Sequence, residues 1–415
     1  MTNIRGRWFL LAMILGLLAQ SKATPVDAIT TIGARATAAS QADPVWSGPA
    51  RLVEEARIGV DIGPEEYMFG QISAVAADGR RIMVADRQAR AVRLYDYDGA
   101  FLGNVGGQGQ GPGEFSRPEA VTIDDAGRIY VLDREHRVVG FDPDGTPGST
   151  FRVPQVACCI WPLYPRAGGG VHVAIIETDR EVQQRRYGVK TFAPDGTEID
   201  AFHRPEIEFE RITYSVNGRQ APLPMSPNAR WGLTPGGALW SGTTDAYRIE
   251  VRAANGDALV LERTWEPVPY AAAEREWWRR MIIVVNRLRE PGWSWDGAEI
   301  PDHKPAFVSV IPVLSGGYWV LREGESVKRP DCTEDPLAAE VTDERSVAAI
   351  QSCWTYEPVI DAFDAEGRLL GEVQAAGLIG RSALVLHVDG NTVVTTAVDT
   401  DGIIRVVRYR LVLPR

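Results

Sequence analysis

The chain has 415 residues, of which 45% are hydrophobic, and it contains 41 glycines and 27 prolines. This length and composition allow a large core and fit a turn-rich, all-β fold. The formal net charge of -11 argues against a nucleic-acid-binding protein, which needs a basic surface.

Residues 1–23 have the pattern of a secretory signal peptide. Arg5 and Arg7 precede the apolar run WFLLAMILGLLA, and the triplet SKA that ends at Ala23 offers small residues to a signal peptidase. The apolar run has about 12 residues, which is short for a bilayer span; an uncleaved anchor is the alternative. We expect an extracytoplasmic protein, periplasmic or secreted, with no stable membrane span after cleavage and with a flexible lead-in over residues 24–50.

The stretch Phe101–Gly145 reads as one complete structural repeat. Alternating apolar residues from Val121, the turn DDAG and the apolar run IYVL predict a β-hairpin. The segment VVGF predicts a third strand, and PDG turns the chain again because glycine accepts the positive φ of such turns. Each repeat is therefore expected to be a small antiparallel sheet.

Two markers recur along the chain and predict the fold. A glycine turn that leads into an apolar strand occurs six times, at Gly79, Gly127, Gly169, Gly236, Gly316 and Gly390. The turn between the last two strands of a repeat occurs only five times, at Gly99, Gly145, Gly196, Gly256 and Gly367. The sixth repeat thus lacks an outer strand, while the strand candidate Arg51–Val60 has nothing of its own to pair with. We predict an all-β, six-bladed β-propeller over residues 51–415, in which the N-terminal strand closes the last blade.

The first two repeats, with the loop GQGQGPGEF between them, resemble the NHL-type repeats of six-bladed β-propellers. The resemblance is clearest over Gly79–Gly145. It implies that Asp86 and Asp133, at the ends of two apolar runs, are structural and bond the backbone of their own blades. It also implies that the GPGEF loop leads one blade into the next.

The four cysteines fit an exported protein. Blade five contains an insertion, residues 322–353, in which Cys332 and Cys353 bracket about 20 residues. A disulfide that closes a loop of this size would stabilise the fold by roughly 3 kcal/mol. For Cys158 and Cys159, a vicinal disulfide, a disulfide to the other pair and two buried thiols all remain open.

A second insertion, residues 270–303 between blades four and five, contains a predicted helix. Its apolar side chains recur at helical spacing, at Trp277, Met281, Val285 and Leu288, and Pro291 ends the pattern. The helix either packs this stripe on the propeller rim or serves as a lid or docking helix. Both insertions fall in connections that emerge on one face of a propeller, so we expect them to build a wall beside the channel and a pocket there.

Little in the sequence points to a particular chemistry. There is no nucleophile elbow, no zinc-protease motif and no complete phosphate loop. The histidines are scattered, with His172 on a predicted second strand and His387 on a predicted inner strand. A calcium or zinc ion is conceivable, because some propellers similar in fold are metal-dependent lactonases or lyases, but no ligand set stands at a diagnostic spacing.

We therefore expect an exported binding or scaffolding propeller for a protein, peptide or saccharide, monomeric because a closed ring exposes no sheet edge. The alternative is a metal-dependent enzyme, lactonase-like or lyase-like, that acts on a small polar substrate in the channel. The candidate binding residues are Arg87, Arg134, Arg137, Trp277 and Arg280.

Overall fold

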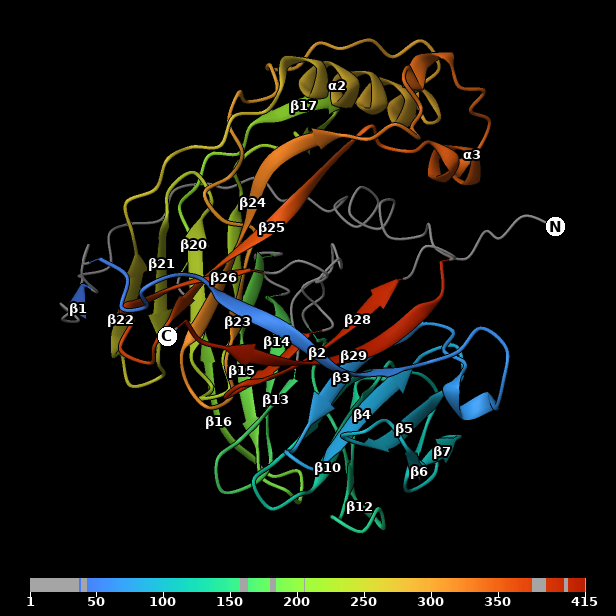
Figure 1. Ribbon diagram of the computed structural model, residues 1–415, viewed down its shortest axis with the longest axis vertical. Helices are drawn as coiled ribbons and strands as arrows, with labels where there is room; N and C mark the ends of the chain where they lie inside the picture. The colour runs from blue at the N-terminus through green and yellow to red at the C-terminus, as the bar shows by residue number, and fades with distance from the viewer. Residues whose placement is uncertain are drawn as a thin grey trace.

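The computed structural model describes residues 37–38, 43–156, 163–179, 184–204, 206–374, 386–398 and 402–414. The predicted signal peptide, Cys158 and Cys159 lie outside these residues. The main strands form six blades of four strands each around one ring, and Figure 1 shows their succession from β3 to β29.

Blades one to three are antiparallel sheets with their strands in chain order. They are β3 (Ile72–Ala77), β4 (Arg81–Asp86), β5 (Ala91–Asp96) and β6 (Phe101–Val105); β9 (Pro118–Ile123), β10 (Ile129–Asp133), β11 (Arg137–Phe141) and β12 (Pro147–Arg152); and β13 (Leu163–Pro165), β14 (Val171–Asp179), β15 (Gln184–Phe192) and β16 (Glu198–His203). In the loop between blades one and two, β7 (Gly107–Gln108) and β8 (Glu114–Phe115) pair in parallel.

Blades four and five follow the same plan. They are β19 (Ala229–Leu233), β20 (Leu239–Thr243), β21 (Arg248–Arg252) and β22 (Ala258–Glu262); and β23 (Ser309–Pro312), β24 (Tyr318–Lys328), β25 (Trp354–Phe363) and β26 (Leu369–Gln374). A short strand, β1 (Thr37–Ala38), adds in parallel to β22. Each predicted glycine turn lies directly before the second strand of a blade, which explains the recurrence of that marker.

Blade six is built from both ends of the ring. Its strands β27 (Leu386–Asp389), β28 (Thr392–Val398) and β29 (Ile404–Val412) are completed by β2 (Ala50–Ile58), which pairs antiparallel with β29. In Figure 1 the blue β2 lies beside the red β29. The prediction that the N-terminal strand closes the last blade is confirmed. Because β2 also pairs in parallel with β26 at Ala50 and Arg51, blades five and six form one continuous sheet.

The core of the ring lies between neighbouring blades. The largest apolar cluster joins blades one, two and three, and its members include the fully buried Met83, Phe115, Tyr130 and Leu163. Each blade thus buries one apolar face against each neighbour, so the ring needs no further element to cover its sheets.

Three insertions assemble into a second body, which we call the cap: residues 212–225, 270–303 and 329–354. It contains the hairpin β17 (Thr213–Val216) and β18 (Arg219–Pro222), the helix α2 (Ala272–Arg287), the 3-10 turn η2 (Pro336–Ala338) and the short helix α3 (Glu344–Ala349). A further 3-10 turn, η1 (Glu65–Tyr67), precedes blade one. Figure 1 shows α2, β17 and α3 together at one end of the molecule, where the long strands β24 and β25 reach them. Among the described helices, none is long and apolar enough to cross a bilayer.

The predicted helical insertion is confirmed, but its apolar stripe does not pack on the propeller rim. Trp277 and Val285 are buried against Val347 and Ile350 of the disulfide-closed loop rather than against the blades. A second side of α2, at Ile282 and Ile283, packs on the β17–β18 hairpin. The cap therefore has its own apolar core.

All three cap segments emerge from the same end of the strands. They follow the outer strand of blade three, the outer strand of blade four and the second strand of blade five, and these connections share one face of a propeller. We call this face the capped face. The opposite face carries the short turns that follow the inner strands.

Candidate binding face

Asp133, at the end of β10, fixes the entry to blade two. It is 1% exposed, and its carboxylate accepts backbone N–H bonds from Ser116 at 3.1 Å and Arg117 at 2.8 Å. Burial alone would raise the pKa of Asp133, but these bonds and the Arg137 guanidinium hold the pKa below its ordinary value. The structural role that the repeat resemblance implies for this aspartate is what the structure shows.

Asp86 repeats the arrangement in blade one. Its fully buried carboxylate accepts N–H bonds from Gly70 at 2.8 Å and Gln71 at 3.0 Å, just before the inner strand β3. In both blades the residue that follows the aspartate is an arginine, Arg87 or Arg134. The buried aspartates therefore place these two arginines on the capped face, close to the inner strands.

Arg137 holds the GPGEF loop. Its Nε lies 3.0 Å from the Asp133 carboxylate, and its two terminal nitrogens donate to the backbone carbonyls of Gln110 at 2.8 Å, Glu114 at 3.0 Å and Gly109 at 3.2 Å. The side chain is only 10% exposed, and its hydrogen-bond donors are used within the fold. This contact explains how the loop leads blade one into blade two.

Arg87 and Arg134 belong to a group that we call the arginine cluster: Arg87, Arg117, Glu119 and Arg134. Glu119 stands on the inner strand β9 and forms ion pairs with both Arg87 and Arg117; the Arg117 Nε lies 3.1 Å from Glu119 Oε1. The backbone N–H of Arg134 donates to the Arg117 carbonyl at 3.1 Å, so Arg134 lies directly beside Arg117.

Positive charge exceeds negative charge in this cluster. Burial lowers the pKa of Arg87. The like charges of Arg117 and Arg134 lower that pKa further, whereas the carboxylate of Glu119 raises it. Arg134 is exposed, and no hydrogen bond or ion pair joins its guanidinium to another described residue. Arg117 and Glu119 are absent from the predicted site residues, although the letters SRPEA directly after the GPGEF loop mark the start of an inner strand.

Trp277 and Arg280, the two candidates in the cap, join α2 to the disulfide-closed loop. Trp277 is 5% exposed and its Nε1 donates to the Thr333 carbonyl at 2.7 Å. Arg280 bonds Glu276 at 2.8 Å and Asp335 at 2.9 Å. These contacts give both side chains a structural role inside the cap, and the structure does not bring them to the arginine cluster. The binding role of the five candidates stays a prediction.

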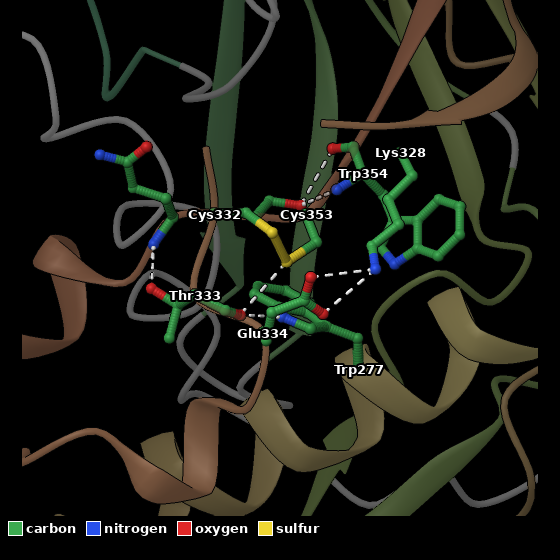
Figure 2. Close-up of a disulfide and its surroundings, with 9 residues drawn as sticks. Trp277, Lys328, Cys332, Thr333, Glu334, Cys353 and Trp354 are labelled. Carbon is green, nitrogen blue, oxygen red and sulfur yellow. Dashed lines mark hydrogen bonds and ion pairs between the residues drawn. A yellow bond between two sulfur atoms is a disulfide. The ribbon is translucent and has the colours of Figure 1, made fainter. Parts of the chain in front are cut away.

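The disulfide between Cys332 and Cys353 closes the cap loop in blade five. Figure 2 shows it next to Thr333 and Trp277, with Lys328 and Glu334 paired at 3.0 Å nearby. Replacing both cysteines by serine is expected to lower the free energy of unfolding by roughly 3 kcal/mol, because the open loop has more conformational freedom when unfolded. Urea denaturation would check the value, and hydrogen exchange should show the loss in α2 and α3. An unchanged cap with faster exchange in the blades would contradict this placement.

The base of the cap is held by Lys304. This lysine is 2% exposed, its Nζ donates to the Gly324 carbonyl at 2.7 Å, and the same atom lies 4.6 Å from the centre of the Tyr356 ring. Burial lowers the pKa of Lys304, and the carboxylates of Glu323 and Glu274 oppose that shift. One cation thus links the end of the 270–303 insertion to the β24–β25 ribbon.

A second buried charge joins blades four and five. Asp361 of β25 is fully buried and accepts hydrogen bonds from Tyr247 at 2.7 Å, Arg263 at 2.6 Å and Arg322 at 2.7 Å. Burial and the neighbouring Asp361 carboxylate raise the pKa of Tyr247 well above its ordinary value. This network fixes blades four and five, from which two of the three cap segments emerge.

The described part of the cap contains a crevice. A polar crevice of about 210 Å³ lies between the turn of the β17–β18 hairpin and the loop after α2, lined by Asn217, Glu290, Trp293 and Asp296 among others. The Asn217 N–H donates to Glu290 at 2.7 Å, so part of the acidic lining is satisfied within the protein. The expected pocket beside the channel stays a prediction.

The described residues bring His, Cys, Asp or Glu side chains together in one place as potential metal ligands. Their one group of potential ligands consists of Cys332, Glu334 and Cys353, and the two sulfurs are bonded to each other. His172 lies on β14, where its Nδ1 is 2.8 Å from Thr191 Oγ1, and His387 lies on the inner strand β27. The metal-dependent alternative stays a prediction.

Burial lowers the pKa of His172 and of His387 to about 4. An unfolded histidine binds a proton below about pH 6.5, so between pH 6.5 and 4 the unfolded chain holds more protons than the folded one. The free energy of unfolding should therefore fall as the pH falls through this window. Urea denaturation at pH 7.5, 6 and 5 would measure the slope, and His172→Gln with His387→Leu should flatten it. An equal slope in the double variant would refute the assignment to these two side chains.

A comparison with protein families agrees with the fold. A family described as a 6-bladed beta-propeller matches residues 63–170. No curated protein matches the chain.

Similar solved structures share little sequence with this chain. A candidate exported protein of Bacteroides fragilis has 10% identity and a TM-score of 0.47, with 90% of this chain and 99% of that chain covered. A streptogramin B lyase has 12% identity and a TM-score of 0.38, with 89% and 100% covered. BamB of Moraxella catarrhalis has 8% identity and a TM-score of 0.31, with 86% and 99% covered. None of these matches carries a conclusion on function. The sheet topology and the family match together identify the chain as a six-bladed β-propeller.

Proposed function

We propose that this protein is an exported binding module, with NHL-type repeats in its first blades, that captures a protein, peptide or saccharide on the capped face. The observation that carries the proposal is that the cap is additional to a complete ring. All six blades have four strands without it, and the cap has its own apolar clusters around Ile282 and Trp277. An insertion that the ring does not need for closure is free to serve recognition.

Three further features support the proposal. Lys304 holds the base of the cap and the Asp361 network joins blades four and five, which reduces the ordering cost of binding. The disulfide in the cap fits an oxidising compartment outside the cytoplasm. The arginine cluster adds accessible cations to the same face.

The test is to probe peptide and oligosaccharide arrays with residues 24–415 and to map a bound ligand by hydrogen exchange. Amides of the capped face, around Arg87, Arg117 and Arg134, should gain protection. Protection confined to the opposite face, at turns such as 78–80 and 125–128, would contradict the proposal. An absence of binders on both arrays would also contradict it.

A further inference from the structure

The capped face contains one place where an incoming anion would find cations already arranged for it. In the arginine cluster the guanidinium groups of Arg87 and Arg117 pair with one carboxylate, and the Arg134 guanidinium has no partner among the described residues. The Nε of Arg87 is buried and likewise has no hydrogen-bond partner there. A buried donor without a partner costs free energy, and an added acceptor would recover it.

The cluster's own geometry indicates which anion fits. Glu119 already places a carboxylate between Arg87 and Arg117, so the spacing of these side chains suits a carboxylate. A second carboxylate between Arg87 and Arg134 would reduce the remaining excess of positive charge. The backbone at Arg87 and Arg134 would not need to move, because Asp86 and Asp133 hold the neighbouring backbone by hydrogen bonds.

The depth of the cluster indicates the kind of ligand. The side chains of Arg87 and Glu119 are only 27% and 24% exposed, whereas Arg134 is exposed at the surface. A ligand carboxylate must therefore reach below the level of Arg134. A glutamate or aspartate side chain has a flexible stem that can do this, whereas the carboxylate of a sugar acid is fixed to its ring.

We infer that the arginine cluster is a binding site for a carboxylate side chain of an acidic peptide segment. This inference rests on the proposed function and names the ligand class for the same face. Recognition of acidic motifs by clustered arginines is a known mode of peptide binding. The aspartates beneath the cluster act as positioning residues, and the contacts to the ligand come from Arg87 and Arg134.

The test is fluorescence anisotropy with the mature protein and two labelled octapeptides, one with four glutamates and one with glutamines in their place. The acidic peptide should bind, and its affinity should weaken as salt is added. The glutamine peptide should bind at least about tenfold more weakly, since it cannot form charge-assisted hydrogen bonds. Arg134→Gln should weaken the acidic peptide by about tenfold.

Arg80→Gln is the matched control, because Arg80 is an exposed arginine in the turn between β3 and β4 on the opposite face. It should leave the affinity unchanged. Equal binding of both peptides, or equal affinity of the wild type and Arg134→Gln, would overturn the inference. If an array ligand still protects the capped face in that case, the proposed function stands and only the ligand class is wrong. Binding of tetragalacturonate without binding of the acidic peptide would replace the peptide by an acidic saccharide.

Discussion

Replacing Asp361 by alanine is expected to lower the free energy of unfolding by about 3–5 kcal/mol. The substitution would leave the guanidinium groups of Arg263 and Arg322 and the Tyr247 hydroxyl without their shared acceptor, at a site where the carboxylate is fully buried. Uncompensated buried charge is among the most costly defects in a folded protein. Urea denaturation monitored by tryptophan fluorescence would measure the change.

Glu372 offers a matched control for Asp361. Its carboxylate contacts the same two arginines, 3.2 Å from Arg322 and 3.7 Å from Arg263, but its side chain is 50% exposed. Glu372→Gln should therefore cost less than about 1 kcal/mol. Comparable losses in the two variants would show that burial of Asp361 does not decide the strength of this network.

Replacing Lys304 by alanine is expected to cost about 3–5 kcal/mol. The variant loses the hydrogen bond to the Gly324 carbonyl, the contact with the Tyr356 ring and the packing of a buried four-carbon stem. It also leaves the buried carboxylate of Glu274 without its nearby cation. The loss of stability should be local. Hydrogen exchange should therefore accelerate in α2 and in the C-terminal half of β24, while the inner strands of blades one to three keep their protection.

Lys328 is the control for Lys304. It is a lysine of the same ribbon, but its ion pair with Glu334 is exposed, at 53% and 71% for the two side chains. Lys328→Ala should cost less than about 1 kcal/mol. Lys304→Met, which keeps most of the apolar volume, separates packing from charge. If Lys304→Met restored wild-type exchange rates in α2, then packing and not the cation would hold the cap.

The repeat markers were sufficient to predict the ring. A glycine turn before each second strand follows from the backbone, because the turn needs a positive φ, as at Gly79 and Gly127. The missing outer strand of the last blade could be matched to Arg51–Val60, and the structure has β2 over Ala50–Ile58. Local patterns of this kind carry information about pairing because each blade is made from neighbouring segments.

The candidate site was less predictable, because its members come together only in three dimensions. Arg134 and Arg137 lie three residues apart and both follow Asp133, yet one is exposed and the other is buried against the GPGEF loop. Arg117 lies just before the inner strand β9 and Glu119 lies on it, and only the blade geometry shows that Glu119 pairs with both Arg117 and Arg87. The helical spacing predicts the face on which Trp277 lies, but not its partner Thr333, which belongs to a different insertion.

The most direct test of the binding site is a crystal structure of residues 24–415 with the glutamate octapeptide. The predicted result is a peptide on the capped face, with one carboxylate within hydrogen-bonding distance of the Arg134 and Arg87 guanidinium groups. A peptide seated on the opposite face, or in the crevice beside Asn217 with the arginine cluster empty, would contradict it.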